Sequence, residues 1–174
     1  MKKNLLLSVA AGVVLFVWGF ISWVILPWHN MAANQFTDEA AVSQVLKANA
    51  PTPGVYYLPF SEKDHGPNQP GAFANVLPQG TDMNMGIMMG TGLVTQIISA
   101  FLVLLLLSQT AGLSYLGKVG FVTLAGFTIA FVSHAPYWNW FSFPTAYVGV
   151  TILDMTIGWA LAGLAVGRFV STRD

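Results

Sequence analysis

The stretch AYVGVTILDMTIGWALAGLAVGRFV, residues 146–170, decides the fold of this chain. It is long and apolar enough to cross a bilayer, since a membrane helix needs about 20 such residues. One carboxylate, Asp154, interrupts it, and a charge at that depth costs roughly 2.5–3.5 kcal/mol even on a lenient insertion scale. Tyr147, Thr151 and Gly158 share a helical face with Asp154. The run therefore predicts a membrane helix whose polar face needs partners.

The rest of the chain has the composition of a membrane protein. Its 174 residues are 55% hydrophobic and 8% charged, whereas soluble domains carry about 25% charged residues. Three more apolar runs, residues 5–27, 85–107 and 117–134, are candidate spans. The first exceeds the roughly 7–15 apolar residues of a signal peptide, so we expect it to be retained as an anchor. We predict an all-α integral membrane protein, a four-helix transmembrane bundle forming a single membrane domain over residues 1–174.

Basic residues predict the orientation of the spans. With the N-terminus inside, one membrane side collects Lys2, Lys3, Lys118, Arg168 and Arg173, leaving only Lys47 and Lys63 outside. The positive-inside rule then places both termini in the cytoplasm and residues 28–84 outside it. Short cytoplasmic loops and the N-terminal Lys-Lys fit a bacterial cytoplasmic (inner) membrane. Aromatic residues near the outer ends, Trp23, Trp28 and the loop Tyr137–Phe143, are expected to form an interfacial belt.

Residues 28–84 form a small extracytoplasmic cap in this interpretation. Thr37 can cap a helix that carries acidic residues in its first turn and Lys47 in its last, which suits the helix dipole. Gly54–Phe60 and Gly71–Leu77 are apolar enough to pair as strands across a loop rich in turn-forming residues. We expect a mixed helix and hairpin cap between the first two spans.

Polar residues in the other spans lie at the depth of Asp154. At 1.5 Å rise per residue, Gln96, Thr123, Trp18 and Ser22 reach the same level of the bundle. With Thr151 and Tyr147 they form a predicted intramembrane polar layer, in which Gln96 is the first candidate partner of Asp154. The carboxyl could be a structural staple or docking point, or it could couple a proton or cation to transport. Relays usually chain several ionisable groups, so an isolated carboxylate favours the structural role.

A metal site at the outer face is a further hypothesis. His29, His134 and His65 all fall on the outer side, and Met83 and Met85 precede the second span. Imidazole and thioether ligands suit copper or zinc. No compact ligand motif is present, and methionine commonly fills irregular packing sites. We therefore predict no cofactor and leave copper or zinc open.

Several function classes are excluded by residues that are missing. The chain has no cysteine, and its net charge of zero offers no basic surface for nucleic acid. It lacks the nucleophile elbow, the Walker loop and the dinucleotide fingerprint. We expect a non-catalytic accessory or assembly subunit of a larger membrane complex, with the lipid bilayer and homo- or hetero-oligomeric membrane partners around it. Two alternatives stay open. One is a small-solute or ion transporter or metal-handling protein with its site near the outer face. The other is a membrane-embedded enzyme acting there through His29, His134 and an external carboxylate.

Overall fold

The structure is a computed structural model that describes residues 2–61, 63, 66–81 and 83–173. The chain divides into two compact units. Met1–Ala33 and Asn84–Asp174 form the helical unit, and Asn34–Met83 form the hairpin unit. Residues 28–33, predicted as part of the external segment, therefore belong with the helices.

The helical unit contains the helices that the hydropathy pattern predicts. Among the described residues, four helices are long and apolar enough to cross a membrane. They are α1 (Lys2–Phe20, continued by the π-helix η1, Ile21–Ile25), α4 (Met85–Leu107), α5 (Tyr115–Phe141) and α6 (Thr145–Val166). The chain is therefore mostly helical, with the makeup of a multi-pass membrane protein.

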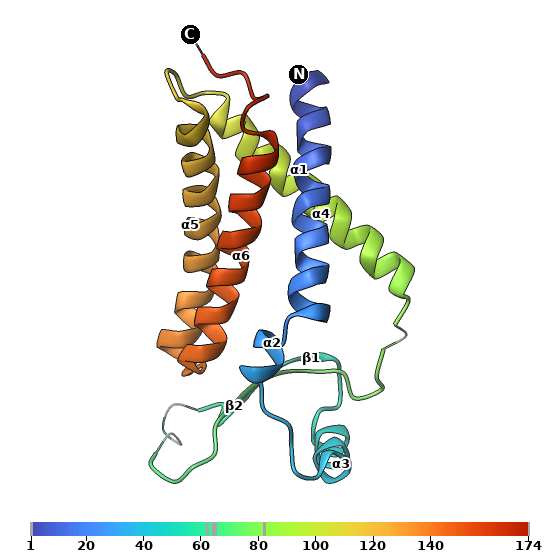
Figure 1. The fold of residues 1–174 in the computed structure, drawn as a ribbon. Coiled ribbons are helices and arrows are strands. Elements are labelled where there is room, and N and C mark those ends of the chain that lie inside the picture. The colour runs from blue at the N-terminus through green and yellow to red at the C-terminus, as the bar shows by residue number, and fades with distance from the viewer. Residues whose placement is uncertain (1, 62, 64–65, 82, 174) are drawn as a thin grey trace. The chain divides into compact units, whose positions relative to one another are not determined.

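Glycines set the close helix contacts within this unit. α1 packs along α4, α5 packs along α6, and α1 joins the two pairs through its contact with α6 (Figure 1). A Cβ atom added at Gly12 of α1 would lie 2.7 Å from the Cα atom of Ile97. A Cβ at Gly126 of α5 would overlap the indole of Trp159. Small residues allow such approach in membrane helices, and the core between the helices includes Ala11, Leu15, Leu104, Leu107, Val122 and Trp159.

Basic residues gather at the end of the helical unit where the chain begins and ends. The segment after α6 returns to the connection between α4 and α5, where the backbone N–H of Arg173 donates to Thr110. The Lys118 ammonium group donates to the carbonyl of Val170 at 2.7 Å. Lys3 also donates to this segment, at Ser171. The α5–α6 connection lies at the opposite end (Figure 1).

Three helices differ from the sequence-based bounds: α1 begins at Lys2 and its π-helical continuation ends at Ile25, and α5 and α6 differ as well. α4 has the expected limits, but α5 runs to Phe141 instead of residue 134 and includes Pro136. The aromatic residues expected in a loop are therefore its last turns, and Ser142 ends the helix in a left-handed conformation at φ 54°. Hydropathy marks where apolar residues stop, whereas backbone hydrogen bonds continue until a residue leaves the helical conformation. α6 ends at Val166, four residues before the end of the apolar run at residue 170.

The hairpin unit contains the predicted helix and strand pair. α3 spans Glu39–Asn49, and β1 (Gly54–Leu58) pairs antiparallel with β2 (Ala72–Val76). The helix cap is Asp38 and not Thr37, because the Asp38 Oδ1 atom accepts from the backbone N–H of Ala41 at 2.9 Å. α2 (Trp28–Met31), a short helix of the helical unit, was not predicted.

Candidate functional site: a buried histidine–aspartate pair

Asp154 lies on the buried face of α6. The face includes Thr151, Asp154 and Gly158, as the helical spacing predicts, and Asp154 is only 6% exposed. It lies nine residues from the start of α6, which corresponds to about 14 Å along the axis. A carboxylate at this position needs donors from the neighbouring helices, because water does not reach it freely.

The chain supplies one donor by folding back after the first span. The π-helical turn η1 ends the span, Leu26 is extended, and α2 begins after Pro27. A π-helical turn re-aims the side chains that follow it and is frequent at functional sites. Because α2 packs against η1 and α6, His29 is carried inward and is only 5% exposed.

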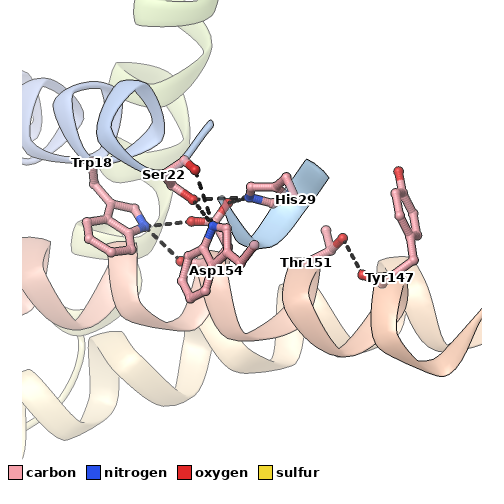
Figure 2. A network of polar contacts seen from close by, with 7 residues as sticks. Trp18, Ser22, His29, Tyr147, Thr151 and Asp154 are labelled. Carbon is pink, nitrogen blue, oxygen red and sulfur yellow. Dashed lines mark hydrogen bonds and ion pairs between the residues drawn. The ribbon is translucent and has the colours of Figure 1, made fainter. Parts of the chain in front are cut away.

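His29 and Trp18 together engage both oxygens of the Asp154 carboxylate (Figure 2). The Nε2 atom of His29 lies 3.3 Å from Oδ2 of Asp154. The indole N–H of Trp18 donates to Oδ1 at 2.7 Å and to the backbone carbonyl of Asp154 at 3.0 Å. Gly158 makes room for this indole, since a Cβ there would lie 2.8 Å from Cδ1 of Trp18. The first span is thus joined to α6 through a satisfied carboxylate.

Aromatic rings enclose the histidine. His29 stacks on Trp23 with ring centroids 3.8 Å apart and planes 8° from parallel. The ring of Trp28 meets it edge-on at 5.8 Å. Ser22, which is fully buried, lies 3.1 Å from Nε2 of His29 and accepts the Trp28 indole N–H at 3.0 Å. The pair therefore lies in an apolar, aromatic pocket with few polar neighbours.

The geometry does not match a hydrolytic triad, although it contains serine, histidine and aspartate. In a triad the nucleophile and the carboxylate approach opposite nitrogens of the imidazole. Here Ser22 and Asp154 both approach Nε2. The arrangement can hold α2 and α1 on α6, and it can bind a proton.

The predicted polar layer is brought together in part. Trp18, Ser22 and Asp154 meet in the network described above. Thr151 and Tyr147 lie on α6 next to it, and the Thr151 hydroxyl donates to the Tyr147 carbonyl at 2.8 Å (Figure 2).

The four other members of the predicted layer do not bond to Asp154 or His29: Thr151 and Tyr147 bond to each other, and Thr123 and Gln96 lie on other helices. Thr123 donates to the Val119 carbonyl of its own helix at 2.9 Å. Gln96 is half-buried on α4 and forms no hydrogen bond within the described part of the chain. The Asp154 carboxylate is contacted by Trp18 and His29, and not by Gln96 as the sequence suggested.

The residues proposed for a metal site are distributed over the chain. His29 is engaged at Nε2, and the Nδ1 of His134 lies 2.9 Å from the Ala130 carbonyl. Met83 belongs to the hairpin unit and Met85 to the helical unit, and both are exposed. His65 lies outside the described residues. Among residues 2–61, 63, 66–81 and 83–173, no group of three or more His, Cys, Asp or Glu side chains could hold a metal ion.

His29 is the site residue that sequence reasoning assigned to a different role. Its position at the end of a span suggested a surface ligand, whereas the chain turns back and buries it against Asp154. The available signal was Pro27, which ends a helix and permits a turn two residues before His29.

Comparisons with protein-family models, with curated proteins and with solved structures find no match to this chain.

Proposed function

We propose that this chain is a non-catalytic accessory or assembly subunit of a larger membrane complex, and that the N-terminal half of α4 is its docking surface. The support comes from the way α4 is used. Its buried residues, Ala100, Val103, Leu104 and Leu107, all lie in its second half. Residues 85–91 are exposed on every side, and this end of α4 projects away from the other long helices (Figure 1).

The Gln96 amide is the observation that carries this proposal. Gln96 lies near the middle of an apolar 23-residue helix and has no hydrogen-bond partner in the described chain. An amide without a partner in hydrocarbon costs several kcal/mol, of order 4–8 on a cyclohexane scale. A glutamine that faces a neighbouring membrane helix forms interhelical hydrogen bonds. The occupant is therefore a membrane-spanning helix of a partner chain that offers a polar side chain at this depth.

Gly90 supports close approach of such a helix. A Cβ atom at Gly90 would have no neighbour within 4 Å, unlike those at Gly12 and Gly126, which serve contacts within the chain. Small residues without an internal contact leave space for a second backbone. The same half of α4 therefore combines an open backbone surface with an unpaired amide one to two turns away.

Cysteine crosslinking tests the docking surface directly, because the native chain has no cysteine. Gly90→Cys and Ile87→Cys place a single thiol on the exposed half of α4. Leu124→Cys, on an exposed position of α5, is the matched control. We expect the two α4 variants to crosslink to another polypeptide in native membranes and the control to remain uncrosslinked. A chain that purifies as a monodisperse monomer in mild detergent, with no α4 crosslink, contradicts the proposal.

Gln96→Leu tests the amide itself. It removes the polar group and retains the apolar bulk, so it should reduce the co-purifying partner without unfolding the chain. Ile98→Ala, on the exposed side of the same helix, is the control for a general change in the helix surface. Equal recovery of the partner from both variants would remove Gln96 from the interface.

We place both termini in the cytoplasm of a bacterium and residues 28–84 on the outer side of its inner membrane. This orientation is supported by basic residues at the end of the helical unit where the chain begins and ends, because such residues favour the cytoplasmic side. They are Lys3, Lys118, Arg168 and Arg173. Single thiols introduced by Ser171→Cys and Gln69→Cys test it. An impermeant maleimide should label the second variant in spheroplasts and the first only after lysis. The reverse pattern would invert the topology.

Proton-coupled transport is a second candidate, favoured by the contact of His29 with Asp154. Two ionisable groups in contact are the smallest unit of a proton relay. Asp154→Asn separates the candidates. A coupled transporter loses proton movement in proteoliposomes while the fold survives, whereas an accessory subunit keeps its partner and shows no proton movement in either form.

A further inference from the structure

We propose that His29 and Asp154 form a proton-sensitive latch, in which the Nδ1 atom of His29 gains and loses the proton and the protonated ring holds α2 more tightly on α6. This inference is independent of the docking surface on α4. It rests on the contacts around the imidazole, which determine which ring nitrogen binds the proton and which side chains lie next to the added charge.

The contacts of Nε2 assign the tautomer of the neutral ring. Nε2 lies 3.3 Å from Oδ2 of Asp154 and 3.1 Å from the Ser22 hydroxyl. An ionised carboxylate can only accept hydrogen bonds, so the nitrogen that faces it carries a hydrogen. Because Nε2 already holds its hydrogen in the neutral ring, the next proton binds at Nδ1.

The environment of Nδ1 makes this proton exchange feasible. The polar contacts of His29 are both made by Nε2, so Nδ1 has no hydrogen-bond partner among the described residues. Every fully buried side-chain nitrogen or oxygen in the described part of the chain does have one. Nδ1 is therefore not fully buried, although the ring as a whole is. Protonation at Nδ1 leaves the contacts of Nε2 with Asp154 and Ser22 in place.

The charge added at Nδ1 strengthens two contacts of α2. It completes an ion pair with Asp154 from α6, and a cation stacked on an aromatic face gains further attraction from Trp23 of η1. Trp28 and Ser22, the other neighbours of the ring, carry no charge. Among the described residues, Asp154 is the only ionisable group within ion-pair distance of His29. Loss of the proton leaves a buried carboxylate without a compensating charge, which is unfavourable.

The sign of the pH dependence follows. The latch is tight when Nδ1 carries the proton and loosens when the proton leaves, so acid favours the tight form. The element that the charge would hold is α2 with the π-helical turn before it, since the contacts that the charge strengthens join these residues to α6. The chain would thus sense pH at the membrane side that α2 faces.

Ring nitrogen shifts of ¹⁵N-histidine test the assignment in the full chain, reconstituted in nanodiscs. His65→Gln with His134→Gln leaves His29 as the only histidine. We expect Nδ1 to titrate while Nε2 stays protonated throughout. In the same background, Asp154→Asn should weaken proton binding by His29. The control Thr156→Val, whose hydroxyl donates to the Ile152 carbonyl of its own helix, should leave it unchanged. Titration at Nε2, or an unchanged midpoint in Asp154→Asn, overturns the proposal.

Two further measurements keep the test decisive if Asp154→Asn fails to fold. Trp23→Leu removes the stacked ring from a half-exposed position and should also weaken proton binding by His29, by a smaller factor. Amide hydrogen exchange, corrected for its intrinsic pH dependence, should be slower in residues 28–31 at pH 5.5 than at pH 8, and His29→Gln should abolish the difference. Exchange in α2 that does not change with pH would show that the proton does not act as a latch.

Discussion

Trp18→Phe is the sharpest test of the buried network. The indole N–H of Trp18 makes two hydrogen bonds to Asp154, one to the carboxylate at 2.7 Å and one to the backbone carbonyl at 3.0 Å. Phenylalanine keeps an aromatic ring next to Gly158 and removes the donor. The change therefore leaves Oδ1 of a buried carboxylate without a partner.

Two reference values bracket the expected loss. Hydrogen bonds to charged groups contribute about 1.5–3 kcal/mol in proteins, whereas interhelical bonds in a membrane protein average about 0.6 and reach about 1.7 kcal/mol. Because Asp154 is only 6% exposed, water does not readily replace the lost donor. We therefore expect the free energy of unfolding to fall by about 2 kcal/mol, with roughly 1.5 kcal/mol as the coupling between Trp18 and Asp154.

A double-mutant cycle measures that coupling. Trp18→Phe, Asp154→Ala and the double variant are unfolded by SDS titration in mixed micelles, and helix content is followed by circular dichroism. Trp140→Phe, at a 77% exposed position, is the control and should change stability by less than about 0.5 kcal/mol. A coupling energy below about 0.5 kcal/mol would refute the view that this bond joins the first span to α6.

Two more predictions concern packing and the buried serines, and the same unfolding assay checks both. Gly126→Ala should cost about 1–3 kcal/mol because the added methyl overlaps Trp159, whereas Gly120→Ala on the same helix, with open space around it, should be tolerated; equal effects would contradict the predicted overlap. Ser22 and Ser8 are both fully buried, but only Ser22 bonds outside its own helix turn. Ser22→Ala should therefore cost about 1 kcal/mol and Ser8→Ala close to nothing, and an equal loss would show that the Ser22 contacts do not stabilise the fold.

Some features of the site were predictable because they depend on helix geometry alone. The rise of 1.5 Å per residue is nearly constant, so the depths of Trp18, Ser22 and Asp154 could be matched from their positions in the spans. Helical periodicity likewise placed Thr151 and Gly158 on the face of Asp154, which is the buried face of α6.

Depth does not determine which side of a helix faces a neighbour. The helical rise predicts Gln96 at the level of Asp154. However, the contact between Gly12 and Ile97 fixes how α4 packs on α1, and Gln96 has no partner in the described chain. Rotation of a helix about its axis depends on side chains from two helices at once. Local pattern analysis of either helix alone could not supply it.

The amino-acid sequence by itself determined the four apolar helices, the bounds of α4, the hairpin and the presence of one carboxylate that needed a partner. These features follow from hydropathy, turn residues and helical spacing, which are local properties of the chain. Only the tertiary structure decided that the partner is His29. That choice depends on the π-helical turn and α2, which fold the chain back after Pro27 and bring residues 125 positions apart into contact. Such a contact is stabilised by surfaces that exist only after the helices have packed.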